Sequence, residues 1–241
     1  ITPYYCVIGG WVIKYMVSFL SGHVGTAAGD DFFTNFIAEP VEPIIWFAIF
    51  VLLTSIVVII GVQKGIEKAS TSLMPILIVL IILISIYCAT RPGALAGVKY
   101  YLLPDIKHFS ATTVLAAMGQ LFYSMSLAMG IMITYGSYMK KEDDLRDSVR
   151  KIEVFDTVVA LLAGLMIVPS VFAFSGGSKE ALSKGPSLMF VTLPKVFNSM
   201  KLGGLIGGGF FILVLFAALT SAISLLETNV SIICDKLHWS R

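Results

Sequence analysis

Charged residues are scarce in this sequence of 241 residues. Only 13% of the chain is Asp, Glu, Lys or Arg, while 57% is hydrophobic. A soluble domain carries roughly 25% charged residues. The period-two alternation of apolar and polar residues that marks a membrane barrel is also lacking. The composition therefore predicts an integral membrane protein built from helices.

Cysteines and basic clusters are equally sparse. The three cysteines, Cys6, Cys88 and Cys234, lie in apolar runs without paired spacing, which argues against a disulfide framework or a metal-binding motif. The formal charge is only +2 and the basic residues form no cluster, so the sequence does not have the basic patch that is typical of nucleic-acid-binding proteins. No nucleophile–base pair or phosphate-binding loop stands out. We therefore expect a protein that is not an enzyme and that holds no organic cofactor.

The sequence also lacks an initiator methionine and a signal peptide. It opens within an apolar run at Ile1 and stops at Arg241 shortly after another, and it has no basic n-region or cleavage site. We therefore expect an internal piece of a longer protein, forming a single transmembrane unit over residues 1–241.

Long apolar runs are what the sequence has in abundance. A spanning helix needs roughly 20 apolar residues. The expected spans are about residues 1–20, 44–62, 73–89, 111–139, 154–174 and 205–233. Basic residues are denser in the short loops on one side, around residues 63–68, 140–151 and 234–241. The positive-inside rule places these loops in the cytoplasm.

The fourth run is poor helix material in its middle. Within residues 119–130, Ser124 and Ser126 compete for backbone hydrogen bonds, and Gly130 has low helix propensity. A helix that loosens inside a membrane leaves backbone groups that need protein, a ligand, an ion or water. Such breaks mark the binding sites of transporters. The alternative is that these small residues only form a helix–helix contact.

Polar side chains in the later spans each allow two interpretations. Asp156, about one turn inside the fifth span, is either a carboxylate favoured by the helix macrodipole or an oxygen ligand for a cation. Thr220 and Ser221 either bond back to the preceding turn or contribute oxygens to a sodium site. Glu227 and Asp235 are either interfacial carboxylates or gate residues near the cytoplasmic mouth.

Several stretches, in chain order, resemble the neurotransmitter:sodium symporter family and especially its bacterial amino-acid transporters. Residues 119–138 resemble the sixth helix of the family, and residues 216–224 (Phe-Ala-Ala-Leu-Thr-Ser-Ala-Ile-Ser) resemble the eighth. Residues 63–68 resemble the loop after the fourth helix, and residues 4–11 fit the third. The resemblance implies an all-α membrane protein with part of an inverted-repeat, leucine-transporter-like fold. About six transmembrane helices, one of them broken, would run from the third to the eighth.

Site residues are assigned through this resemblance. The substrate-lining positions are Ile1, Tyr5, Tyr123, Ser124, Ser126, Met129, Ser221 and Leu225. Sodium ligands are Ser124 and Asp156 at a first site, and Ala217 (through its backbone oxygen), Thr220 and Ser221 at a second. The positions that match a cytoplasmic gate are Tyr138, Glu227 and Asp235.

Four positions depart from the family pattern: Tyr123, Ser124, Ala128 and Asp156. Ser124 stands where a threonine is common and Ala128 where a glycine is common, and the other two departures change the chemistry of the site. Tyr123 stands where the family usually has a phenylalanine lid over the substrate, so it adds a hydroxyl group. Asp156 stands where several members have asparagine. We hypothesise that its fixed negative charge replaces the chloride ion that animal members require.

The resemblance implies sodium-coupled symport of a small amino acid or related amine, by alternating access across a bacterial inner (plasma) membrane. The expected partners are that substrate, sodium ions and the lipid bilayer, with no nucleic acid; a homodimer is left open. One alternative is a non-transporting truncated remnant or a structural membrane subunit. Another is a channel, which would need pore-lining polar rings that the sequence does not show.

Overall fold

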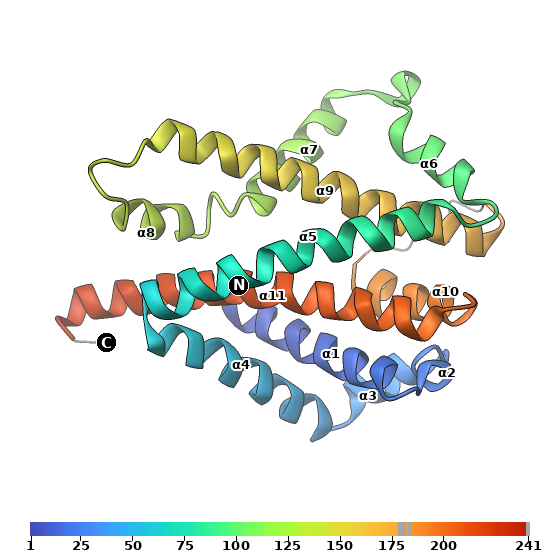
Figure 1. Cartoon of the computed structure of the whole chain (residues 1–241), viewed down its shortest axis with the longest axis horizontal. Coiled ribbons are helices and arrows are strands. Elements are labelled where there is room, and N and C mark those ends of the chain that lie inside the picture. Colours follow the sequence, from blue (N-terminus) through green and yellow to red (C-terminus); the bar gives the residue numbers. More distant parts are fainter. Residues whose placement is uncertain (178–181, 183–184, 240–241) are drawn as a thin grey trace.

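The computed structural model describes residues 1–177, 182 and 185–239, and this part of the chain contains helices and no β-strand. Five long helices run roughly lengthwise (Figure 1): α1 (Thr2–Leu20), α4 (Glu42–Ile60), α5 (Lys68–Ala89), α9 (Leu145–Ser175) and α11 (Gly203–Leu237). Four stretches of the described chain are long and apolar enough to cross a membrane: Glu42–Ile60, Lys64–Ala89, Leu145–Ser175 and Gly203–Leu237. The expected all-α membrane fold is confirmed.

Helix α11 is the central element and contacts α1, α4, α5, α8 and α10. Small residues and aromatic rings form its contact with α1. A Cβ atom on Gly207 would lie 2.2 Å from the Phe19 ring, so the glycine allows that ring to reach α11. Tyr15 and Phe19 both pack on Phe211, with ring centroids 5.3 and 5.2 Å apart. Close approach at small residues is the usual basis of helix packing in membranes.

Short helices gather at one end of the molecule, on the right in Figure 1. They are α2 (Val24–Ala27), α3 (Phe32–Ala38), α6 (Ala94–Leu102), the π-helical turn Leu188–Thr192 and α10 (Leu193–Asn198). An ion pair between Lys195 and Asp30 joins α10 to the turn before α3. The hydroxyl of Tyr15 donates to the carbonyl of Phe190 over 2.7 Å, and this bond ties the turn at residues 188–192 to α1. At the other end, α4 and α5 meet through a π-helical turn, Val62–Glu67.

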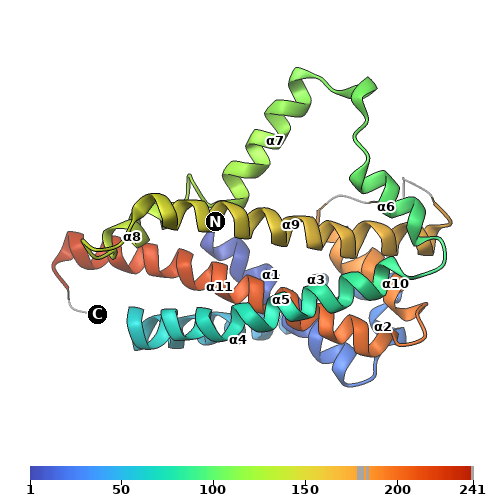
Figure 2. The same cartoon turned by 45° about the horizontal axis from the view of Figure 1, so that its top comes forward.

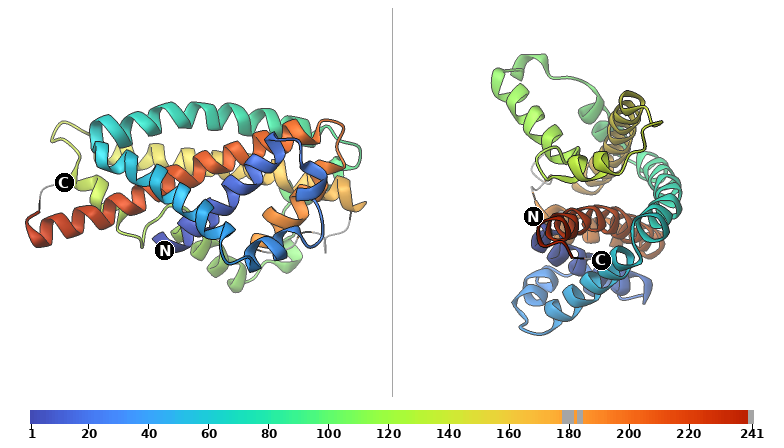
Figure 3. Two further views of the ribbon diagram at one scale, coloured as in Figure 1. Left: turned by 90° about the horizontal axis from the view of Figure 1, so that it is seen from below. Right: turned by 90° about the vertical axis from the view of Figure 1, so that its left-hand side faces the viewer.

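The fourth apolar run is divided into α7 (Ala111–Ser124) and α8 (Ile131–Ser137), separated by residues 125–130. The predicted break is therefore present. None of the residues of α7 is buried, and Figure 2 shows this helix projecting away from the remaining long helices. Viewed end-on in the right panel of Figure 3, α11 lies between the pair α1 and α4 on one side and the segments α7, α8 and α9 on the other.

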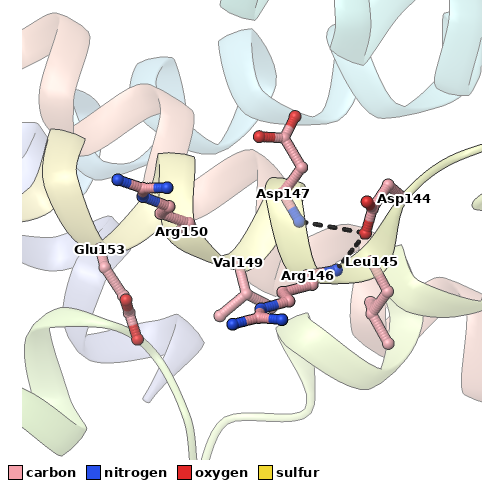
Figure 4. A pocket seen from close by; sticks show the side chains of 7 residues that line it. All are labelled: Asp144, Leu145, Arg146, Asp147, Val149, Arg150 and Glu153. Carbon is pink, nitrogen blue, oxygen red and sulfur yellow. Dashed lines mark hydrogen bonds between the residues drawn. The ribbon is translucent and has the colours of Figure 1, made fainter.

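Helix α9 begins nine residues before the expected span of residues 154–174. The Asp144 carboxylate accepts hydrogen bonds from the backbone N–H groups of Arg146 at 2.8 Å and Asp147 at 3.2 Å (Figure 4). This cap satisfies donors that a helix start leaves open, so the charged stretch is helical. Asp156 therefore lies eleven residues after Leu145, about three turns into the helix, and the expected depth of one turn was wrong.

Candidate functional site

The break between α7 and α8 holds two residues in the left-handed backbone region. Gly130, which precedes α8, has φ of 79°, and Ser126 has φ of 56°. A residue with a side chain in that region costs about 1–2 kcal/mol, so the surrounding structure stabilises a strained turn at Ser126. A Cβ atom on Gly130 would also lie 3.0 Å from the Thr228 methyl group on α11. Glycine at this position serves both the turn and the close approach.

Ser124, the last residue of α7, faces Asp156 on α9. Its hydroxyl oxygen lies 2.7 Å from one carboxylate oxygen and 2.9 Å from the other. The influence of the helix dipole falls off within the first turn, and Asp156 is three turns inside α9. The macrodipole therefore does not account for this carboxylate. The pair presents three oxygen atoms at the break, the donor type that hard cations prefer.

A cavity of about 550 Å³ opens beside this pair. It lies within the size range of small-molecule sites. Six of the predicted site residues line it: Ser124, Ser126, Tyr138, Asp156, Thr220 and Ser221. No three His, Cys, Asp or Glu side chains converge in the described part of the chain. The described lining offers hydroxyl groups together with the carboxylates of Asp156 and Glu67, and such oxygen donors suit a hard cation.

The residues predicted for a second sodium site form one turn of α11. The Thr220 hydroxyl lies 3.0 Å from the Ala217 carbonyl oxygen and 3.1 Å from that of Phe216. The hydroxyl thus bonds back to the preceding turn, the simpler of its two interpretations. The Thr220 oxygen retains lone pairs while it donates. The hydrogen bond also keeps the Thr220 hydroxyl oxygen beside the Ala217 carbonyl oxygen. Ser221, the next residue of the helix, lines the cavity together with Thr220.

Five predicted substrate-lining residues do not line this cavity. Ile1 lies at a separate hollow of about 460 Å³ beside Thr54. Leu225 is buried within α11, and Met129 lies in the break. Tyr5 lies on α1, and Tyr123 lies on α7 next to Ser124 in the sequence. They share no wall with the Ser124 and Asp156 pair.

Two hydrogen bonds connect α8 to α11. The Tyr138 hydroxyl donates to a carboxylate oxygen of Glu227 over 2.5 Å, and Glu227 is fully buried. The Tyr135 and Ser224 hydroxyls lie 2.7 Å apart. Asp235 is exposed and lies eight residues beyond Glu227. Two of the three predicted gate residues are therefore in direct contact, and the third is not grouped with them.

Sequence reasoning missed Tyr135 and Ser224. A signal for Ser224 was available, because Thr220, Ser224 and Thr228 recur every four residues and therefore share one face of a helix. Each of these hydroxyls donates to the carbonyl four residues earlier, at 2.9–3.1 Å. The resulting stripe of hydroxyl groups faces α8.

A broken membrane helix beside an oxygen-lined cavity is characteristic of secondary transporters. Comparisons with known proteins give the particular family. The Sodium:neurotransmitter symporter family matches residues 33–241. The chain belongs to this family, and the predicted resemblance is confirmed.

Individual relatives agree with this assignment. The chain is 39% identical over 236 residues to an uncharacterized sodium-dependent transporter of Bacillus subtilis, YhdH, covering 97% of this chain and 51% of the relative. It is 36% identical to an uncharacterized sodium-dependent transporter of Haemophilus influenzae, covering 100% of this chain and 53% of that protein. The crystal structure of MhsT in complex with L-phenylalanine matches with a TM-score of 0.86 and 41% identity, over 99% of this chain and 54% of MhsT. The chain thus spans about half the length of the relatives it matches.

Proposed function

We propose that the protein containing this chain is a sodium-coupled symporter of a small amino acid or related amine in a bacterial inner membrane. The observation that carries the proposal is the contact of Ser124 with both carboxylate oxygens of Asp156 at the break. A cation seated there would join α7 to α9. Its binding energy would then order the strained turn at Ser126.

The second ion position rests on α11. The carbonyl of Ala217 and the hydroxyls of Thr220 and Ser221 provide oxygen atoms within a single turn, and Thr220 is already held 3.0 Å from the carbonyl. A sodium ion needs several such oxygens, and further ligands would come from outside this turn. Because the turn belongs to a continuous helix, the three groups keep their relative positions while neighbouring segments move.

The substrate assignment rests on similarity and on the lining of the cavity. MhsT, to which the chain is 41% identical, was crystallised with L-phenylalanine. The substrate would lie against Ser126 and Ser221 in the cavity of about 550 Å³. By the family resemblance, Tyr123 would form its lid and Tyr5 would bind its carboxylate once the helices move together, and Ile1, Met129 and Leu225 would complete the pocket in other states of the cycle.

Alternating access requires a closure that can open toward the cytoplasm. The Tyr138–Glu227 bond joins the second half of the broken helix to α11, and Asp235 lies further along α11. Release of this bond would free α8 from α11. In the same cycle, the negative charge of Asp156 would take the place of a chloride ion beside sodium, so uptake should not require chloride. Uptake that depends on chloride would contradict this role of Asp156.

The test is uptake of radiolabelled amino acids by the full-length protein in proteoliposomes, with and without an inward sodium gradient. We expect uptake to require sodium, and Ser221→Ala to reduce it because one ligand position and one pocket contact are lost. Uptake that proceeds equally well in potassium would overturn the proposal. Absence of uptake for every amino acid and amine tested, with the protein correctly folded, would do the same.

A further inference from the structure

A separate cavity of about 230 Å³ lies at the end of the molecule where α10 meets α11. This is the α10 end of the molecule in Figure 1, at the start of α11, whereas Glu227 lies in the later turns of that helix. Three segments form its walls: residues 91–92 after α5, residues 170–174 at the end of α9, and residues 196–201 between α10 and α11. None of these segments lines the cavity at the helix break.

The charged side chains among the described lining residues of this cavity are all positive. Arg91 and Lys201 are its charged members, and neither forms an ion pair with a carboxylate in the described part of the chain. The positive end of the α11 dipole begins two residues after Lys201. The hydroxyls of Ser170 and Ser199 already donate to the helix carbonyls of Met166 and Val196. The two cationic side chains are therefore the donors available to a ligand.

Arg91 is held in a fixed orientation. Its guanidinium carbon lies 4.2 Å from the centroid of the Tyr87 ring, so the ring supports one face of the guanidinium group. One terminal nitrogen reaches the Thr90 hydroxyl at only 3.4 Å. Nε is covered from solvent and has no hydrogen-bond partner among the described residues. A covered donor without an acceptor costs about 1–3 kcal/mol.

A simpler role for Arg91 is to neutralise the carboxyl end of α5. That role would be expressed as hydrogen bonds from the guanidinium group to the last carbonyls of the helix. The covered Nε makes no such bond within the described chain. The stacking on Tyr87 fixes the plane of the guanidinium group, and its terminal nitrogens, not the covered Nε, are the groups that can offer hydrogen bonds to a ligand in the cavity.

We propose that this cavity binds a small monocarboxylate. A carboxylate matches the planar fork of Arg91 with two parallel hydrogen bonds, and Lys201 would add a second charge. Phe174, Val196 and Met200 line the cavity with apolar surface for a short hydrocarbon body. The volume equals that of about eight water molecules at roughly 30 Å³ each, which is enough for an acid of a few carbon atoms.

The same lining disfavours an amino acid. The ammonium group of a zwitterion would enter a cavity with two cations and no carboxylate among its described lining residues. The ligand therefore differs in chemistry from the substrate proposed for the cavity at the helix break. The two sites are also separate in place, so each can be tested without the other.

The test is equilibrium binding of radiolabelled propionate to the purified full-length protein in detergent. We expect saturable binding that is weakened about ten- to a hundredfold by Lys201→Gln or Arg91→Gln, since a hydrogen bond to a charged group contributes about 1.5–3 kcal/mol. Arg91→Lys keeps the charge but loses the fork, so a smaller loss is expected. Lys99→Gln removes an exposed positive charge of α6 at the same end and should leave binding unchanged.

Three results would overturn the proposal. The first is the absence of saturable propionate binding. The second is binding that neither Lys201→Gln nor Arg91→Gln weakens although both proteins are folded. The third is displacement of propionate by chloride as effectively as by acetate at equal ionic strength. That would mark the cavity as a general anion site without preference for a carboxylate.

Discussion

Replacing Asp156 by asparagine removes the charge from the Ser124–Asp156 pair and changes little else. The side chains have nearly the same size, and the amide can still accept a hydrogen bond from the Ser124 hydroxyl, now 2.7 and 2.9 Å from the carboxylate oxygens. If sodium binds here, the variant loses the attraction between an anion and a cation. We expect Asp156→Asn to weaken sodium binding while the protein stays folded.

The expected loss of sodium affinity follows from the fact that Asp156 would contact the ion with a charged group. A hydrogen bond or ligand contact to a charged group contributes about 1.5–3 kcal/mol, and each 1.4 kcal/mol is tenfold in affinity. The sodium concentration for half-maximal uptake should therefore rise about ten- to a hundredfold in Asp156→Asn. Ser124→Ala removes a neutral ligand that water can replace, so its effect should stay below about tenfold. Because the two residues touch, the double variant should deviate from additivity by about 0.5–3 kcal/mol.

The assay is initial-rate uptake of the best transported amino acid at a series of sodium concentrations, with constant ionic strength. Thr157→Ala is the matched control. It is the next residue on α9, is exposed, and its hydroxyl bonds back to the Glu153 carbonyl at 2.8 Å, so its sodium dependence should equal that of the parent protein. An unchanged sodium dependence in Asp156→Asn, or strictly additive effects in the double variant, would refute the assignment of this pair to sodium.

Three further changes test other contacts. Tyr138→Phe removes the donor that lies 2.5 Å from buried Glu227, which should lower stability by about 1–3 kcal/mol and the melting temperature of the full-length protein in detergent. Gly10→Ala places a Cβ atom 2.7 Å from the α4 backbone; we expect a loss of about 1–3 kcal/mol from overpacking, seen as a lower melting temperature than in a surface glycine-to-alanine control. The hydrogen bond from Lys195 lowers the pKa of the Asp30 carboxyl, so the stability from this pair is complete above about pH 4 and is lost as the pH falls through the lowered pKa. Asp30→Asn should abolish that portion of the acid dependence of the melting temperature, and an unchanged acid profile would contradict it.

Apolar runs of spanning length made the main helices predictable, but their ends depended on groups that hydropathy does not register. The charged residues before Val154 looked like a loop, although Asp144 caps α9 and makes them helical. This single cap changed the depth of Asp156 from one turn to three and removed its simplest explanation. Hydrophobicity fixes where a helix can lie in a bilayer, whereas side-chain caps decide where it begins.

The break was predictable because serine and glycine weaken a helix, yet its geometry was not. Gly130 adopts a positive φ, as a glycine can, but Ser126 adopts one as well, and no local propensity favours that. The contact of Ser124 with Asp156 joins residues 32 positions apart. It was reached through resemblance to a family, because the spacing of two polar residues on different helices carries no periodic signal.

The length of α11 has a mechanical consequence. Its 35 residues give a rod of about 52 Å, against a hydrocarbon thickness of roughly 30 Å. Its first turn adjoins Lys201 and its later turns hold Glu227, so one continuous helix connects the two ends of the molecule. A tilt of about 5° around the midpoint displaces each end by about 2 Å in opposite directions. That distance is comparable to the length of a hydrogen bond, so a small rocking motion at one end of α11 is sufficient to make or break contacts at the other end.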